Sequence, residues 1–183
     1  MKIREFKSEI WLPLPPDQLF SFFADAANLE TLTPPWLNFK ILSPLPIEMR
    51  EGALIDYKLQ IHSLPIKWHT RISSWRPPHI FVDEQLRGPY RKWVHKHIFE
   101  PADGGTLVRD LVNYAVPFDF FVHSWLVRPD IEKIFRYRSD RLRQHFRGHG
   151  PGQYGISAGE IVIVLQRAVT DYRKSDHRKS PRK

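Results

Sequence analysis

A long run of alternating residues in the middle of this chain limits the folds that it can adopt. From Leu54 to Val116 apolar and polar residues alternate with a period of two, as in strands with one buried face. Turn signals such as Gly88-Pro89 and Asp103-Gly104-Gly105 interrupt the run at short intervals. Because short connections favour antiparallel neighbours, the run predicts an antiparallel sheet of consecutive strands.

The segment before this run predicts one further long strand, two short helices and a short strand. Lys2 to Leu12 alternates and is expected to be the first strand of the sheet. Residues 18–24 and 28–32 are expected to be helices, with Asp17 as a candidate cap of the first one. Residues 39–42 are expected to form the short strand.

After Pro117 the apolar residues recur at helical spacing, which predicts one long amphipathic helix. This helix is expected to begin near Phe120 or after Pro129 and to run to about His145. A sheet with one apolar face and one long helix bury both surfaces when the sheet curls around the helix. The expected fold class is therefore α+β, a curved antiparallel sheet wrapped around the long helix, with a cavity between them.

The 183 residues suffice for one sizeable domain, which we assign to residues 1–147. The remaining residues, 148–183, read as a basic extension, because seven Lys or Arg and two Asp fall between 167 and 183. Ser157 and Glu160 match a capping box and predict a short helix over 158–173. Such an extension is either a solvated end or a surface for self-association or peripheral membrane contact.

Composition excludes several classes of protein and site. The chain has no cysteine, which rules out disulfides, thiolate metal sites and cysteine nucleophiles. No run approaches the roughly 20 apolar residues of a membrane span, and the N-terminus lacks the apolar core of a signal peptide. No motif of a nucleic-acid-binding fold is present. We expect a cytoplasmic protein without specific nucleic-acid binding.

The hairpin from Phe81 to Glu100 gathers polar and aromatic side chains on one face. Alternation places on this face Phe81, Asp83 and Gln85 of its first strand, and Trp93, His95, His97 and Phe99 of its second. An interior of this kind is typical of a ligand pocket rather than of a plain core. The candidate ligand-binding residues are Tyr57, Trp68, Phe81, Asp83, Gln85, Trp93, His95, His97, Asp110 and Tyr114.

Two kinds of chemistry are open to the polar members of this set. His95 and His97 point the same way and could ligate a metal with Asp83 or Asp110, but no metal-binding motif supports this, and we expect no metal and no cofactor. The same four side chains are candidates for acid–base catalysis in a partly apolar site. The alternative is that they hydrogen-bond to one another as a polar wall.

Four stretches resemble the SRPBCC superfamily, and in particular bacterial members of undefined activity. They are LFSFFADAANLETLTPPW, REGALIDYKL, WRPPHIFVDEQLRGPYRKWVHKHIFEP and DGGTLVRDLVNYAVP, within residues 1–147. The superfamily has the START-like helix-grip fold, shared with polyketide cyclases/dehydrases, coenzyme Q-binding proteins and Bet v 1-type allergens. The resemblance implies a cavity that holds a hydrophobic ligand such as a lipid, isoprenoid or polyketide. We therefore expect a binder of a hydrophobic or amphipathic small molecule, with a cyclase/dehydrase-type enzyme as the alternative.

Overall fold

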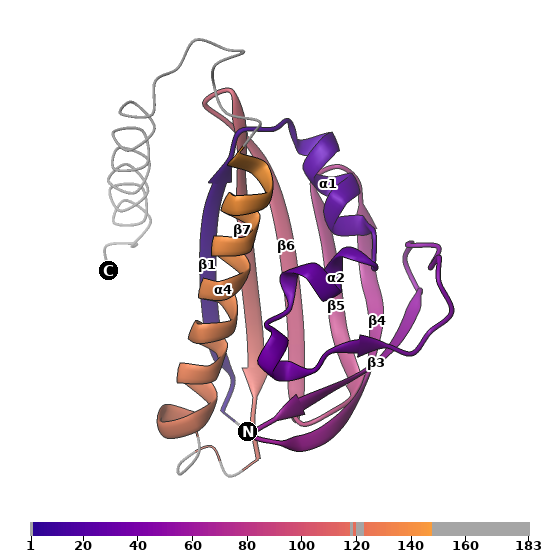
Figure 1. Ribbon diagram of the computed structural model, residues 1–183, viewed down its shortest axis with the longest axis vertical. Helices are drawn as coiled ribbons and strands as arrows, with labels where there is room; N and C mark the ends of the chain where they lie inside the picture. Colours follow the sequence, from indigo (N-terminus) through magenta and orange to yellow (C-terminus); the bar gives the residue numbers. More distant parts are fainter. Residues whose placement is uncertain (1, 118, 120–122, 148–183) are drawn as a thin grey trace, which may run out of the picture. The chain divides into compact units, whose positions relative to one another are not determined.

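The computed structural model describes residues 2–117, 119 and 123–147, which contain one seven-stranded antiparallel sheet and helices on one of its faces (Figure 1). The strands are β1 (Arg4–Leu12), β2 (Lys40–Ile41), β3 (Leu54–Ile61), β4 (Leu64–Arg76), β5 (Ile80–Arg87), β6 (Lys92–Ala102) and β7 (Gly105–Ala115). The helical elements are α1 (Pro16–Ala24), α2 (Asn28–Leu32), the 3₁₀ turn η1 (Pro35–Leu37), the π-helical turn η2 (His123–Val127) and α4 (Arg128–Phe146).

The strand order in the sheet is β1-β7-β6-β5-β4-β3-β2. Consecutive strands pair from β2 to β7, and β1 completes the sheet by pairing with β7, from Arg4 opposite Tyr114 to Leu12 opposite Thr106. The predicted fold class, a curved antiparallel sheet with one long C-terminal helix of the domain, is confirmed.

The sheet curves around the helices, and irregular pairing between β4 and β5 contributes to this curvature. The register of this pair shifts between His69 and Thr70 and again between Ile72 and Ser74. Such bulges bend a strand and increase its twist. Figure 1 shows that β3 and β4 bend toward the face on which α1, α2 and α4 lie.

Helix α4 begins close to the later of the two predicted starts. Its second residue is Pro129, a position where the missing N–H of proline costs no helical hydrogen bond. The helix ends at Phe146 and buries one stripe, made of Ile131, Phe135, Leu142 and Phe146. This stripe packs on the concave face of the sheet.

The predicted cap of the first helix was wrong. Helix α1 begins at Pro16, Pro15 is its N-cap residue, and no side chain caps it. Asp17 lies inside the first turn, where its negative charge is favourable beside the positive end of the helix dipole. Proline at the start fixes the backbone angle, so the helix forms without a capping side chain.

Two of the apolar clusters hold helices against the sheet. One holds α1 against the sheet through residues such as Leu19, Phe20 and Phe99, and the other holds α4 against β7 through Val112 and Ile131.

No helix among the described residues is long and apolar enough to cross a membrane. The predicted extension, 148–183, and its helix at 158–173 lie outside the described residues, and the domain boundaries remain a prediction.

Candidate ligand-binding site

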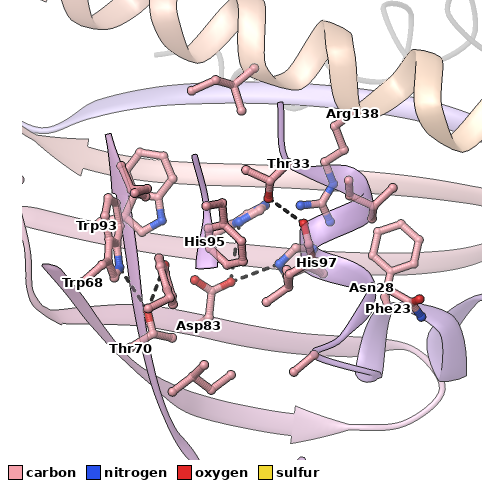
Figure 2. A pocket seen from close by; sticks show the side chains of 18 of the residues that line it. Phe23, Asn28, Thr33, Trp68, Thr70, Asp83, Trp93, His95, His97 and Arg138 are labelled. Carbon is pink, nitrogen blue, oxygen red and sulfur yellow. Dashed lines mark hydrogen bonds and ion pairs between the residues drawn. The ribbon is translucent and has the colours of Figure 1, made fainter. Parts of the chain in front are cut away.

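A cavity of about 200 Å³ lies between the concave face of the sheet and the helices α2 and α4 (Figure 2). Its lining is mostly apolar and comes from α1, α2, η1, β3, β4, β5, β6 and α4. The aliphatic and phenylalanine residues in it include Leu32, Leu37, Phe39, Ile55, Leu59, Ile61, Ile72, Ile131, Ile134 and Phe135. Charged and polar side chains join it at one part of the wall. A cavity of this composition suits a ligand with an apolar body.

One wall of the cavity is aromatic, and its polar atoms are hydrogen-bonded within the protein. Trp68 donates from Nε1 to Thr70 Oγ1 at 3.0 Å, and Tyr57 Oη lies 3.4 Å from the same oxygen. The rings of Tyr57 and Trp68 stack with centroids 5.8 Å apart. Burial raises the pKa of Tyr57, with the nearby Asp83 adding to the effect, so its phenol stays neutral. This wall therefore offers ring surface rather than charge.

Tyr90 extends the aromatic wall, and Gln85 holds it in place. The ring of Tyr90 lies 4.6 Å from that of Trp93, centroid to centroid. Gln85 donates from Nε2 to the Tyr90 carbonyl at 2.6 Å and accepts from the Tyr90 N–H at 3.2 Å. Gln85 thus fastens the turn between β5 and β6 and does not line the cavity.

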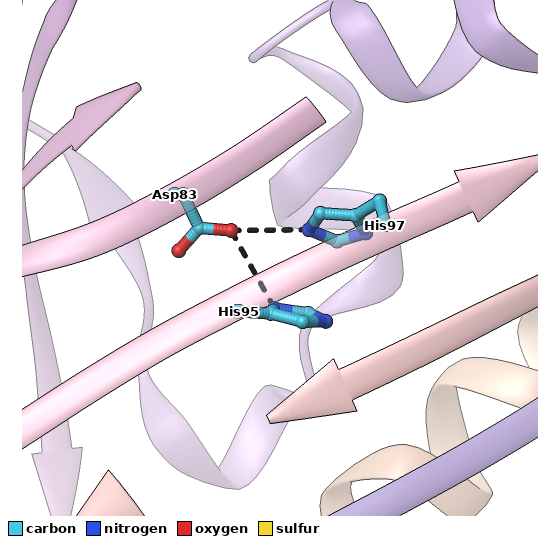
Figure 3. A group of neighbouring side chains, drawn as sticks. All are labelled: Asp83, His95 and His97. Atoms are coloured by element: carbon cyan, nitrogen blue, oxygen red, sulfur yellow. Dashed lines mark hydrogen bonds and ion pairs between the residues drawn. The ribbon is translucent and has the colours of Figure 1, made fainter. Parts of the chain in front are cut away.

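The polar part of the wall is a buried cluster of two aspartates and two histidines. Asp83 on β5 lies opposite His95 on β6, and His97 lies opposite Asp110 on β7. His97 Nε2 is 3.0 Å from Asp83 Oδ2, and His95 Nε2 is 2.9 Å from Asp110 Oδ1. The other ring nitrogens lie 3.5 Å (His95 Nδ1 to Asp83 Oδ2) and 3.0 Å (His97 Nδ1 to Asp110 Oδ1) from carboxylate oxygens. Each imidazole therefore lies between two carboxylates, and Figure 3 shows the side of the cluster that Asp83 forms.

The environment of this cluster pushes the pKa values of its members apart. Burial raises the pKa of Asp110, but the charge of Arg138 and the contacts from both histidines outweigh it and hold that pKa well below its usual range. The pKa of Asp83 is lowered in the same way, mainly by the two histidines. Burial and the neighbouring His97 lower the pKa of His95, whereas for His97 the two carboxylates outweigh burial and raise the pKa.

Arg138 brings a positive charge from α4 to the cavity. Figure 2 shows its side chain descending from the helix on the side of His97. Its guanidinium carbon lies 5.1 Å from the ring centroid of Phe23, and its buried Nε has no hydrogen-bond partner among the described residues. Arg138 is one of five arginines on α4. Its spacing, three residues after Phe135 and four before Leu142, is the signal that placed it on the buried stripe.

The structure brings most of the predicted ligand-binding residues to the cavity. Those that line it are Tyr57, Trp68, Phe81, Asp83, Trp93, His95 and His97. Gln85 lies on β5, where it hydrogen-bonds to the backbone of Tyr90, and Asp110 lies behind the two histidines. Tyr114 is buried elsewhere, with Oη 2.9 Å from His123 Nε2. Sequence reasoning missed Tyr90, Thr70 and Arg138 as lining residues.

This fold and cavity define a helix-grip protein with an internal, mostly apolar site. The chain belongs to the family of polyketide cyclases/dehydrases and lipid transport proteins, whose family model matches residues 12–143. The resemblance to the SRPBCC superfamily is thereby confirmed. No curated protein matches the chain.

Solved structures share the fold at low sequence identity. The Zhui aromatase/cyclase from Streptomyces sp. R1128 is 14% identical, with a TM-score of 0.63 over 85% of this chain and 100% of its own. Protein CV1439 from Chromobacterium violaceum is 14% identical, with a TM-score of 0.62 over 78% and 97% of the two chains. Ara h 8.0201 is 18% identical, with a TM-score of 0.55 over 78% and 99%. These likenesses establish the fold.

Proposed function

We propose that this protein binds a hydrophobic or amphipathic small molecule, of lipid, isoprenoid or polyketide type, in the cavity between sheet and α4. The observation that carries the proposal is an apolar cavity with one localised cluster of ionisable side chains in its wall, Asp83, His95, His97 and Arg138. Such a cluster is not expected in a plain apolar core, because burying charged groups costs free energy unless they interact with one another or with a ligand. Membership of a family described as cyclases/dehydrases and lipid transport proteins supports the same class of ligand.

The aromatic part and the polar part of the wall contact different parts of the ligand. The apolar body of the ligand lies against Tyr57, Trp68, Phe81 and Trp93, where removal of apolar surface from water contributes roughly 25 cal/mol per Å². The polar end lies at Asp83, His95 and His97, which fix its orientation. The volume of about 200 Å³ favours a compact ligand over a long unbranched chain.

The first experiment is mass spectrometry of small molecules released when the purified protein is denatured, together with titration of an apolar fluorescent probe, N-phenyl-1-naphthylamine. Ile134→Trp fills the cavity from α4, and the exposed Arg136→Trp on the same helix is the matched control. We expect probe affinity to fall at least about tenfold in the first variant only, which corresponds to about 1.4 kcal/mol. Equal probe binding by a folded Ile134→Trp variant would argue against ligand binding in this cavity.

A second candidate function is a cyclase/dehydrase, with His95 and His97 as base and acid. The observation that favours it is a pair of adjacent imidazoles whose pKa values move in opposite directions, on the wall of an apolar site. Loss of turnover of a β-polyketone thioester in His95→Gln, with probe binding retained, would support it. Absence of turnover in the wild-type protein with a panel of such substrates would count against it.

The cytoplasmic location remains part of this proposal, as does the interaction of residues 148–183 with membranes or a second copy. Deletion of 151–183 tests the latter. Loss of dimer formation or of liposome binding supports an interaction, and unchanged behaviour removes both.

A further inference from the structure

Three donor atoms of the Asp–His cluster converge at the cavity wall. These atoms, one from each of Asp83, His95 and His97, lie within 4.8 Å of one another (Figure 3). The strands fix them, because His95 and His97 alternate onto the same face of β6 and Asp83 lies directly opposite His95 on β5. The imidazole of His97 is further held by the ring of Phe81, which stacks on it with centroids 4.1 Å apart.

The hydrogen-bonding groups of the cluster do not match one another without an added cation. Four nitrogen–oxygen separations of 2.9 to 3.5 Å link the two imidazoles to two carboxylates, yet two neutral imidazoles carry one N–H each. Asp110 Oδ1 is hydrogen-bonded to His95 Nε2 at 2.9 Å and lies 3.0 Å from His97 Nδ1, which has no hydrogen-bond partner among the described residues. In one pair of tautomers both imidazole protons lie on the Asp110 side. The remaining nitrogens, His95 Nδ1 and His97 Nε2, then direct their lone pairs at Asp83 Oδ2. With both imidazoles neutral these acceptors face one another, and a cation, either a metal ion or a proton on His97, removes the repulsion between them.

We propose that Asp83, His95 and His97 bind a divalent transition-metal ion and that Asp110 orients the two imidazoles from behind. The separations of 3.0 and 3.5 Å from Asp83 Oδ2 to the two nitrogens resemble the edges of a coordination shell with bonds of about 2.1 Å. Two imidazoles and one carboxylate select zinc, iron, cobalt or nickel over magnesium and calcium. The open positions face the cavity, where water or an oxygen of a ligand completes the shell.

Asp110 and Arg138 have supporting roles in this site. Metal-bound histidines commonly donate their second N–H to a carboxylate, which fixes the tautomer and the ring orientation. Asp110 is hydrogen-bonded in this way to His95 Nε2 and lies 3.0 Å from His97 Nδ1. The positive charge of Arg138 lies close enough to keep both carboxylates ionised. The sequence contains no metal-binding motif, so the inference rests on the geometry of these residues and goes beyond the proposed ligand binding.

The test uses the untagged full-length protein, stripped with a chelator and titrated with Co²⁺ and Zn²⁺, with Mg²⁺ as a comparison. We expect one Co²⁺ or Zn²⁺ per chain by elemental analysis and a visible absorption spectrum of protein-bound Co²⁺. Asp110→Asn should weaken binding about 10- to 100-fold, and Asp83→Asn or His97→Gln should weaken it further. The matched control is His69→Gln, because His69 pairs with Asp56 at 2.6 Å on the exposed face and should leave metal binding unchanged.

A measurement on the wild-type protein guards against variants that fail to fold. In the metal-bound form, NMR of the imidazole nitrogens should find the proton of His95 on Nε2 and that of His97 on Nδ1. Substoichiometric uptake without a change in the His95 and His97 resonances would overturn the proposal and leave a proton as the missing cation. Undiminished uptake by a folded Asp83→Asn/His97→Gln double variant would overturn it as well, because the ion would then bind elsewhere.

Discussion

The ring of Phe81 stacks on the imidazole of His97, with centroids 4.1 Å and planes 18° apart. The two residues are directly opposite each other on β5 and β6. Phe81 also belongs to the apolar cluster under α1, where it contacts Phe20 and Phe99. One side chain therefore joins the core of the domain to the charged wall of the cavity.

Truncation of this side chain should be costly. We expect Phe81→Ala to lower the free energy of unfolding by about 3–5 kcal/mol, because it removes buried ring surface and leaves a void. Urea denaturation measures the change. The control is Leu86→Ala on the same strand, which is 46% exposed and should change stability by no more than about 0.5 kcal/mol. Similar changes in the free energy of unfolding for the two variants would contradict a large contribution of Phe81 to the packing of the core.

The turn between β5 and β6 should matter for both stability and binding. Gln85→Ala removes two hydrogen bonds to the backbone of Tyr90 and should cost about 1–2 kcal/mol in urea denaturation. Because Tyr90 lines the cavity, affinity for N-phenyl-1-naphthylamine should fall too. Gln144→Ala, which loses only a 3.3 Å contact with Arg141 on the surface of α4, should change neither quantity. Normal probe affinity in Gln85→Ala would show that the turn does not position Tyr90.

A side chain at Gly105 should force β1 away from β7. An added Cβ would meet the carbonyl oxygen of Leu12 and lie 2.7 Å from the ring of Trp11. We expect Gly105→Ala to destabilise the domain by about 1–3 kcal/mol and to speed hydrogen exchange along β1. Gly52→Ala is the comparison, because Gly52 has open space around it and a φ of +85°, so only local backbone strain is added. Equal exchange of β1 amides in both variants would rule out strand separation.

The pair of His123 and Tyr114 should make stability depend on pH. Burial, with a contribution from the charge of Arg4, lowers the pKa of His123 in the folded protein below its unfolded value of about 6.5. The unfolded state therefore binds the proton more readily. Stability from this residue is complete above that unfolded value and declines as the pH falls from it toward the folded pKa, by at most about 1.4 kcal/mol per pH unit.

His123→Gln keeps an acceptor for the Tyr114 hydroxyl but cannot titrate. The difference in unfolding free energy between wild type and variant should therefore shrink as the pH falls from 7 to 5. A constant difference over this range would show that His123 does not titrate differently in the two states.

Sequence alternation predicted the cavity face where the strands are regular. The pairing of β5 with β6 runs without interruption from Ile80 to Glu84, so Phe81, Asp83, His95 and His97 lie on the face that their spacing indicated. Gln85 lies beyond the last pair of β5 with β6 and beside a register shift in the pairing of β4 with β5, and its side chain hydrogen-bonds to the backbone of Tyr90. Tyr114 lies on the inner face, but the π-helical turn brings His123 over it, and no pattern in the sequence predicts that turn.

Arg138 shows a different limit of sequence reasoning. Periodicity places it on the buried stripe of α4, but a charged residue among five arginines on one helix reads as solvent-exposed. Its position is explained only by the carboxylates of Asp83 and Asp110 on other strands, which interact favourably with its positive charge. Hydrophobic patterns therefore suffice for the layers of the domain, whereas the electrostatics of the cavity depend on contacts between distant segments.

The pairing of β1 with β7 has a consequence for folding of the chain during its synthesis. Strand β1 meets its neighbour only after more than a hundred further residues have been synthesised, since Arg4 pairs with Tyr114. Strands β3 to β7 each pair with the strand made just before them, so this part of the sheet grows in order of synthesis. In a nascent chain that stops before Gly105, β1 has no partner strand and its backbone N–H and C=O groups are unpaired. Such an unpaired strand can associate with other chains. The sheet is complete only when β7 has been made and pairs with β1, and contacts between residues so far apart in sequence make folding slow.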